Sequence, residues 1–261
     1  MPQSLPSNTR TSWEAASRPT LLFVAAYALS MTPHEAAHAV VAYLLGFSST
    51  LFQLWVNPDA AHATPNQQAL IAAAGPLFSA SVAAVSLLIY RKLRCRPSGL
   101  VFLMLGTVGI YIFLGSVLAT AMGGDFNIVL TALGTPESVR YAVSATGLIL
   151  LPLFMFFVGR ELLRWAPIGM SRAKAVACTT VAPWLIGTLV ATIFYLPLPR
   201  FLIGPSLIGS VFWVFAVLGA ALGRDSRGQT VLSSITRSDL ILLTAAVVMV
   251  RLLVPGVHLG R

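Results

Sequence analysis

The chain has 261 residues, of which 57% are hydrophobic and only 10% are charged. Soluble domains carry about 25% charged residues, and a soluble fold of this size could not bury so much apolar surface, so a lipid bilayer must solvate part of it. The formal net charge of +9 does not indicate nucleic-acid binding, because the basic residues cluster at the ends of apolar segments, as in membrane proteins.

The order of polar and apolar segments predicts an all-α polytopic membrane protein. Residues 1–19 are polar and predict a short cytoplasmic tail. Seven apolar stretches follow, most of them close to the ~20 residues that a helix needs to cross hydrocarbon. They cover residues 20–46, 69–90, 99–122, 141–159, 174–196, 204–222 and 239–255. We therefore expect about seven transmembrane helices.

The distribution of basic residues predicts the orientation in the membrane. If the N-terminus is cytoplasmic and the spans alternate, only four of the 17 basic residues lie outside or at outer helix ends: Arg140, Arg200, Arg251 and Arg261. This asymmetry follows the positive-inside rule, and an odd number of spans places the C-terminus outside. A cleaved signal peptide is the alternative for the N-terminus, but apolar sequence resumes from Ala39 to Phe47, so one continuous helix is simpler.

The loop at residues 48–68 is the longest between the predicted spans. Residues 50–56 are rich in β-branched and aromatic side chains, and Asn57-Pro58-Asp59 is typical of a turn. This pattern predicts either a short β segment at the membrane surface or an interfacial loop anchored by Trp55.

The first predicted span carries the motif His34-Glu35-Ala36-Ala37-His38. Residues four apart share a helix face, so His34 and His38 can direct two imidazoles at one ion, with Glu35 beside them. HExxH on a helix is the zincin pattern of two ligands and a general base. The alternative is a hydrogen-bonded polar cluster between helices. Ionisable groups near mid-bilayer are costly and usually functional, which favours a Zn²⁺ site.

A catalytic zinc site normally has a third protein ligand, and Asp125 is the best candidate among the eight acidic residues. It follows the third apolar stretch, in the segment Gly123-Gly124-Asp125-Phe126-Asn127, where the two glycines permit close backbone approach. Its alternative role is to cap a helix over residues 126–134.

Three other ionisable residues are weaker candidates for the third ligand. His62 lies in the outer loop, where an isolated histidine is usually solvated. Glu161 is flanked by Arg160 and Arg164, so ion pairing accounts for it better. His258, near the C-terminus, is expected to be exposed.

The sequence resembles the site-two protease family of intramembrane zinc metalloproteases. Three features, which occur in the same order along the chain as in that family, carry the resemblance. These are the HEAAH motif in a membrane helix, an Ala-Gly-Pro element at residues 74–76, and an Asp after the third span. They lie within residues 20–135, the size of that family's three-helix metalloprotease core. Residues 136–261 would then be accessory membrane helices.

The resemblance implies specific roles for the residues of the motifs. His34, His38 and Asp125 would hold Zn²⁺, and Glu35 would be the general base. The bilayer and a membrane-spanning protein substrate are the implied partners.

The resemblance also gives roles to residues around the site. Gly75 and Pro76 would shape helix packing near the metal. The strand-like residues 50–56 resemble the family's membrane-associated β segment, which could pair with an unwound substrate by strand addition.

The chain departs from the family pattern around Asp125, and it is at most a divergent member. The family usually carries an Asn-Pro pair before an Asp-Gly. Here no Asn-Pro precedes Asp125, and Phe126 replaces the glycine. Asn127 is the candidate to replace the lost polar contact.

The sequence thus predicts a zinc metalloendopeptidase that hydrolyses peptide bonds of membrane-spanning substrates. One alternative is a catalytically inactive scaffold of the same fold that binds client helices, but a scaffold has no need of a buried base such as Glu35. The other is a metal or solute transporter, which would show paired broken helices in two related halves. The second half has no polar-cored segment to match the first.

Overall fold

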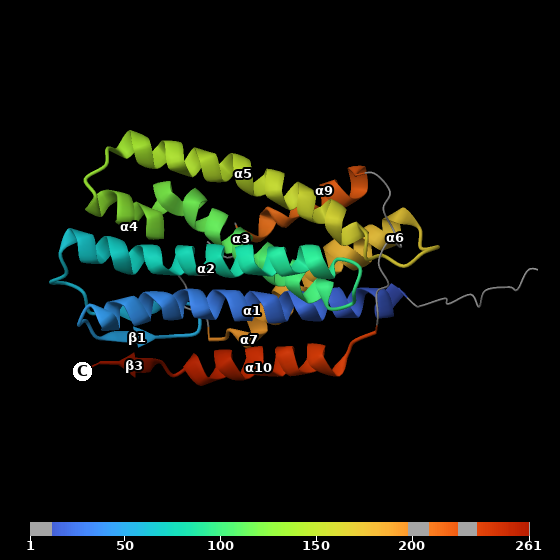
Figure 1. Ribbon diagram of the computed structural model, residues 1–261, viewed down its shortest axis with the longest axis horizontal. Helices are drawn as coiled ribbons and strands as arrows, with labels where there is room; N and C mark the ends of the chain where they lie inside the picture. The colour runs from blue at the N-terminus through green and yellow to red at the C-terminus, as the bar shows by residue number, and fades with distance from the viewer. Residues whose placement is uncertain (1–11, 198–208, 224–233, 261) are drawn as a thin grey trace, which may run out of the picture.

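The computed structural model describes residues 12–197, 209–223 and 234–260, which form a bundle of long helices with a small sheet at one end (Figure 1). Four helical segments are long and apolar enough to cross a membrane: Pro65–Leu93, Gly99–Met122, Glu137–Leu163 and Arg172–Phe194. They support the expectation of a helical membrane protein.

Two of these four segments are single α-helices, and the other two contain 3₁₀ or π-helical turns. The first is helix α2 (Pro65–Leu93) and the third is α5 (Glu137–Leu163). The second joins α3 (Gly99–Leu118) to the 3₁₀ turn η1 (Ala119–Met122), and the fourth runs through α6 (Arg172–Val176), the π-helical turn η2 (Ala177–Val181) and α7 (Ala182–Phe194). The remaining helices are α1 (Ser12–Leu44), α4 (Asp125–Ala132), α9 (Trp213–Leu222) and α10 (Arg237–Leu253).

Helix α1 starts earlier than the sequence suggested. It begins at Ser12, so residues 12–19 are helical and not an irregular tail, while residues 1–11 of the predicted tail lie outside the described residues. Its 33 residues correspond to a length of about 50 Å. Polar side chains from Ser30 to His38 lower its hydropathy below that of the four apolar segments.

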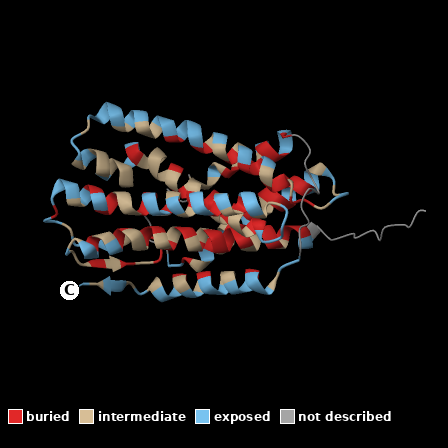
Figure 2. Cartoon of the chain, in the orientation of Figure 1, coloured by how far each residue is buried: buried red, intermediate tan, exposed pale blue. Residues whose placement is uncertain are grey.

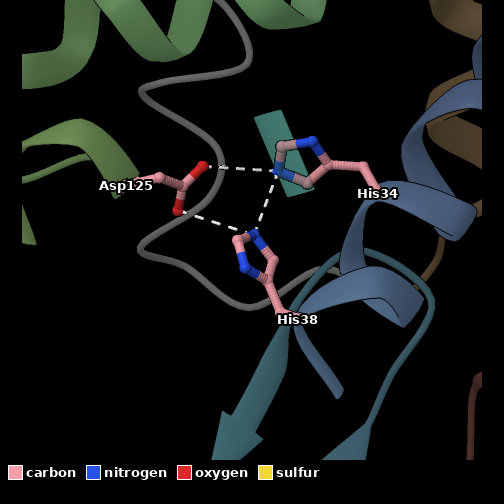
Figure 3. Close-up of side chains that lie close together, drawn as sticks. All are labelled: His34, His38 and Asp125. Atoms are coloured by element: carbon pink, nitrogen blue, oxygen red, sulfur yellow. Dashed lines mark hydrogen bonds and ion pairs between the residues drawn. The ribbon is translucent and has the colours of Figure 1, made fainter. Parts of the chain in front are cut away.

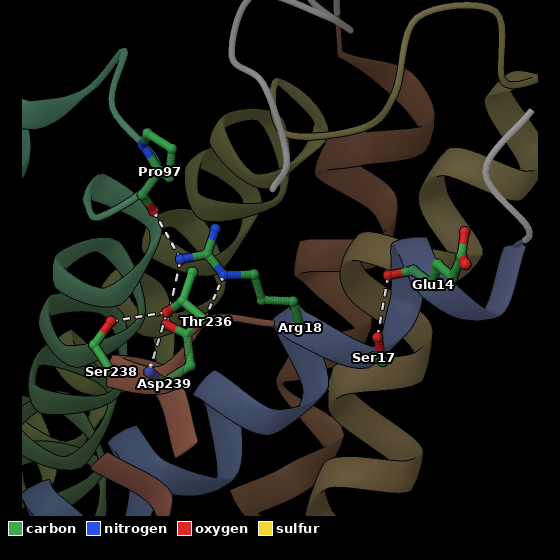
Figure 4. Close-up of polar contacts among 7 residues, drawn as sticks. All are labelled: Glu14, Ser17, Arg18, Pro97, Thr236, Ser238 and Asp239. Carbon is green, nitrogen blue, oxygen red and sulfur yellow. Dashed lines mark hydrogen bonds and ion pairs between the residues drawn. The ribbon is translucent and has the colours of Figure 1, made fainter. Parts of the chain in front are cut away.

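The early start of α1 is explained by a buried ion pair with α10 (Figure 4). Arg18 Nε donates to Asp239 Oδ2 at 2.8 Å, and the side chains of the two residues are 2% and 1% exposed. Arg18 also donates to the Pro97 carbonyl at 3.1 Å. Asp239 is fixed in turn by a capping box with Thr236 at the start of α10. This cluster joins α1, the α2–α3 connection and α10 at one end of the bundle.

Removing one partner of this pair is expected to destabilise the protein strongly. Arg18→Ala should lower the free energy of unfolding by about 3–5 kcal/mol, because it leaves the Asp239 carboxylate buried without its cation. Denaturant unfolding in detergent micelles measures the change. The double replacement Arg18→Met with Asp239→Leu should recover most of the loss; equal stability of Arg18→Ala and wild type would contradict the assignment.

A β segment is present near the predicted place, as part of a three-stranded sheet, but its bounds differ. Asn57 and Pro58, which were predicted to form a turn, lie in a strand, and the chain turns earlier, within the predicted strand. Strand β1 (Ser49–Leu51) lies between β2 (Val56–Pro58) and the C-terminal strand β3 (Val257–Leu259), and both pairings are antiparallel. Residues 52–55 form the connection between β1 and β2, where Phe52 and Trp55 stack with ring centroids 4.1 Å apart. The pairing of β3 with β1 was not foreseen.

Burial follows the pattern of a protein solvated by lipid. Buried residues concentrate along α1 and on the helix faces turned toward it, and the outer faces of α2, α5 and α10 are exposed (Figure 2). Exposed side chains on α5 are large and apolar, as for Ile149 and Phe157 at 66% and 54% exposure. Such a continuous apolar outer face is suited to acyl chains and not to water.

Candidate metal centre

The two histidines of the motif project from the last third of α1. They lie at the end of the bundle that holds the sheet (Figure 1). His38 is six residues before the last residue of α1, or about 9 Å along the helix axis. The motif is therefore displaced from the middle of the helix, where the sequence had suggested it, toward the β hairpin.

Asp125 reaches the histidines from a turn and not from the end of a transmembrane helix. The second apolar segment ends at Met122, and Gly123 turns the chain with φ +92°, a left-handed conformation that favours glycine. Gly124 then caps α4, and Asp125 is the first residue of that helix. The N-cap position considered for Asp125 is occupied by Gly124, and the Asp125 carboxylate lies against His34 and His38 of α1.

His34, His38 and Asp125 bring three ligand atoms together (Figure 3). His34 Nε2 lies 3.3 Å from His38 Nε2 and 3.3 Å from Asp125 Oδ2, and His38 Nε2 lies 3.7 Å from Asp125 Oδ1. Donors at about 2.0–2.2 Å from a tetrahedral zinc ion are about 3.3–3.6 Å apart. The two imidazole nitrogens and the two Asp125 oxygens therefore have nearly the spacing expected around a tetrahedral zinc ion.

Hydrogen bonds from neighbouring helices orient each of these side chains. His38 Nδ1 lies 2.6 Å from the Ile71 carbonyl; since a carbonyl only accepts, Nδ1 carries the proton and Nε2 has a free lone pair. His34 Nδ1 lies 3.0 Å from Ser79 Oγ, and Ser116 Oγ donates to Asp125 Oδ2 at 3.3 Å. Partners of this kind typically fix the ligands of a metal.

Gly75 of α2 leaves the space that an ion would need. A Cβ at this position would lie 2.7 Å from His34 Nε2 and still closer to His38 Nε2. A methyl group at residue 75 would thus occupy the point on which the two nitrogens converge. Gly75 and the following Pro76 are both buried, and the ligand spacing together with this cradle shows that the residues present fit a zinc ion.

Glu35 lies beside the three ligand atoms without joining them. It is 9% exposed, the backbone N–H of Val56 in β2 lies close to its carboxylate, and Asp125 is within Coulombic range. The strand β2 thus lies directly against the predicted general base.

Asn127 is connected to the site through Arg140. The Arg140 guanidinium donates to Asn127 Oδ1 at 3.1 Å and to Thr131 Oγ1 at 3.0 Å. Because Asn127 and Thr131 lie on α4, whose first residue is Asp125, Arg140 fixes the position of the helix that supplies the carboxylate. Asn127 itself contacts Arg140 and not the histidines.

Loss of this clamp is expected to weaken metal binding. Arg140→Ala should reduce zinc affinity about 10–100-fold, the usual effect of removing a group that orients a ligand. Competition with a chromogenic chelator measures the affinity. Arg91→Ala, at an exposed position near the opposite end of the bundle, is the control; equal affinities of the two variants would show that Arg140 does not position Asp125.

The other candidate ligands lie elsewhere. Glu161 accepts hydrogen bonds from Arg94 at 2.7 and 2.9 Å and from Tyr90 at 2.5 Å, and the bond to Glu161 raises the pKa of Arg94. His62 and His258 are both exposed. The expectation that ion pairing accounts for Glu161 is confirmed.

Sequence reasoning missed the orienting residues of the site. Ser79 could have been found, since it follows Gly75 by four residues and so shares its helix face. The Ile71 carbonyl and Arg140 could not be predicted from the sequence. Every residue has a backbone oxygen, and an arginine near the start of a helix is common.

Comparisons with models of known protein families, with curated proteins and with solved structures find no match for this chain.

Proposed function

We propose that the chain is a membrane-embedded zinc metalloendopeptidase that hydrolyses peptide bonds of membrane-spanning proteins. The observation that carries the proposal is the convergence of His34, His38 and Asp125 next to Glu35. Two imidazoles and one carboxylate leave a fourth position of a tetrahedral ion for water or substrate, as in catalytic zinc sites.

The residues around this position have separate tasks in hydrolysis. Zinc bound there would polarise the substrate carbonyl and lower the pKa of water. The Glu35 carboxylate accepts a proton from the attacking water and delivers it to the amine nitrogen as the C–N bond breaks. His34 and His38 would present their Nε2 atoms to the ion, with their Nδ1 atoms held by Ser79 and the Ile71 carbonyl.

Among the described residues no strand pairs with the edge of β2 that faces away from β1, and this supports strand addition as the mode of substrate binding. Bonds from Phe52 N to Trp55 O and from Asp59 N to Ser48 O show which pairs of the hairpin exchange hydrogen bonds. By the alternation of an antiparallel ladder, the Val56 N–H points away from β1, toward Glu35. An extended substrate added to this edge would pass directly beside the base, whereas the other edge of β1 is covered by β3.

We further propose seven spans, with the N-terminus cytoplasmic and the C-terminus outside the cell membrane. In addition to the four apolar segments, α1 is long enough to cross, and α9 and α10 are shorter helices of the same bundle. The contact of Arg18 with Pro97 and the pairing of β3 with β1 join segments that this topology places on the same side.

Reconstitution tests the proposed activity. Purified protein in vesicles should cleave members of a panel of labelled single-span proteins with helix-breaking residues near the outer surface. Chelation should abolish cleavage, and added zinc should restore it. Zinc-loaded protein that binds these spans without cutting any would instead indicate a scaffold, and zinc flux across the vesicle membrane would indicate a transporter.

A further inference from the structure

Tyr195 carries a buried hydroxyl group that is not satisfied by a normal hydrogen bond within the part of the chain that the structure describes. The residue caps the C-terminal end of α7 and is 2% exposed. Among the residues that the structure describes, its Oη has no hydrogen-bond partner of normal geometry. Thr32 Oγ1 lies beside it and donates its own proton to the Gln53 carbonyl at 3.1 Å, so Thr32 does not donate to the Tyr195 hydroxyl, and the contact between the two oxygens lacks normal hydrogen-bond geometry. An unpaired buried hydroxyl costs about 1–3 kcal/mol, so its presence requires an explanation.

Tyr195 lies on the same side of α1 as Glu35. Its ring lies edge-on to Tyr27 of α1 with centroids 5.9 Å apart, and it belongs to the same buried apolar cluster as Ala28. Ala28 and Glu35 are seven residues apart, or about two helical turns, and so point in nearly the same direction. Tyr195 therefore covers the face of α1 that carries Glu35, and the Glu35 carboxylate is within Coulombic range of its hydroxyl.

Gln53 joins Tyr195 to the strand that lies against Glu35. This residue, in the connection between β1 and β2, is 3% exposed. Its Nε2 donates to the carbonyls of Tyr195 at 3.2 Å and Pro197 at 3.3 Å. The end of α7 is thereby attached to the hairpin whose Val56 contacts Glu35. Tyr195 is therefore held close to β2, the strand that is proposed to pair with the substrate.

We propose that Tyr195 Oη donates a hydrogen bond to the carbonyl oxygen of the peptide bond that is cleaved. As water adds to the carbonyl carbon, this oxygen gains negative charge, and a fixed donor stabilises it most in the transition state. The phenol keeps its proton throughout. The hydroxyl of water goes to the acyl carbon, and the other proton passes through Glu35 to the amine nitrogen.

The burial of Tyr195 agrees with this role. His34, Glu35 and Tyr195 are 3%, 9% and 2% exposed. A substrate that reaches Glu35 must therefore displace the helices or strands that bury these residues, and this would also expose Tyr195. Among the described residues Oη has no hydrogen-bond partner of normal geometry, so its bond to the substrate would replace only the contact with Thr32 Oγ1.

The test is the isosteric variant Tyr195→Phe, and it rests on the proposed peptidase function. Its kcat should fall about 10²–10³-fold, the usual effect of losing one such donor, with KM and zinc content unchanged. Its stability should be equal to that of the wild type or higher, because an unpaired buried hydroxyl is removed.

Tyr90→Phe is the matched control, since the Tyr90 hydroxyl donates to Glu161 on other elements of the bundle. It should lose stability and keep its kcat. Full activity of Tyr195→Phe beside an inactive Glu35→Gln would overturn the role of Tyr195 alone, as would a loss of stability like that of Tyr90→Phe. A wild-type protein without zinc-dependent cleavage would instead overturn the proposed function.

Discussion

Glu35→Gln is expected to retain zinc and to lose peptide cleavage by a factor of roughly 10²–10⁴, the contribution of a positioned general base. The amide has nearly the shape of the carboxylate and can still contact the Val56 backbone, but it cannot accept a proton from water. Glu35 lies beside the three ligand atoms and is not one of them, so the metal should remain. Cleavage rate and zinc content measured on the same preparation separate these effects.

The control for this variant is Glu137→Gln, in the exposed first turn of α5. It makes the same change in charge at an exposed residue that is not among the ligand atoms, and it should leave both quantities unchanged. Undiminished cleavage by a zinc-loaded Glu35→Gln protein would show that Glu35 is not the base.

Gly75→Ala is expected to abolish zinc binding. The added methyl group would lie 2.7 Å from His34 Nε2 and closer still to His38 Nε2, at the point where the two nitrogens converge. The imidazoles are held from behind by Ser79 and Ile71, so they cannot retreat without breaking those bonds. Elemental analysis of the purified variant should find less than a tenth of the wild-type zinc.

Gly115→Ala in α3 provides a matched comparison, because a Cβ there meets nothing within 4 Å. Both changes add one methyl group to a glycine in a helix of the bundle. Gly115→Ala should bind zinc as the wild type does. If the Gly75→Ala protein contained as much zinc as the wild type, the ion would not be bound between the two histidines.

The residues of the candidate site were largely predictable from the sequence because the pattern that brings them together is local. The i, i+4 spacing of His34 and His38 fixes their common face, and the glycines before Asp125 mark the place where the chain turns back. The residues that orient them are supplied by α2, α3 and α5. Their partnership depends on how the helices pack, which no local pattern encodes.

The fold was predicted in its class and less well in its long-range contacts. Composition indicated membrane helices, and four segments support this. Arg18 and Asp239 are 221 residues apart in the sequence, and each resembles an ordinary charged helix end. Strand β3 has only three residues, too few for an alternating pattern to stand out.

The most direct test of the account is the metal content and X-ray absorption spectrum of the purified full-length protein. We predict one zinc ion per chain, with two imidazole nitrogens and one carboxylate oxygen at about 2.0–2.2 Å, and loss of zinc in His34→Ala, His38→Ala and Asp125→Ala. Protein that binds no zinc when supplied with it, or variants that retain the same zinc spectrum, would contradict the account.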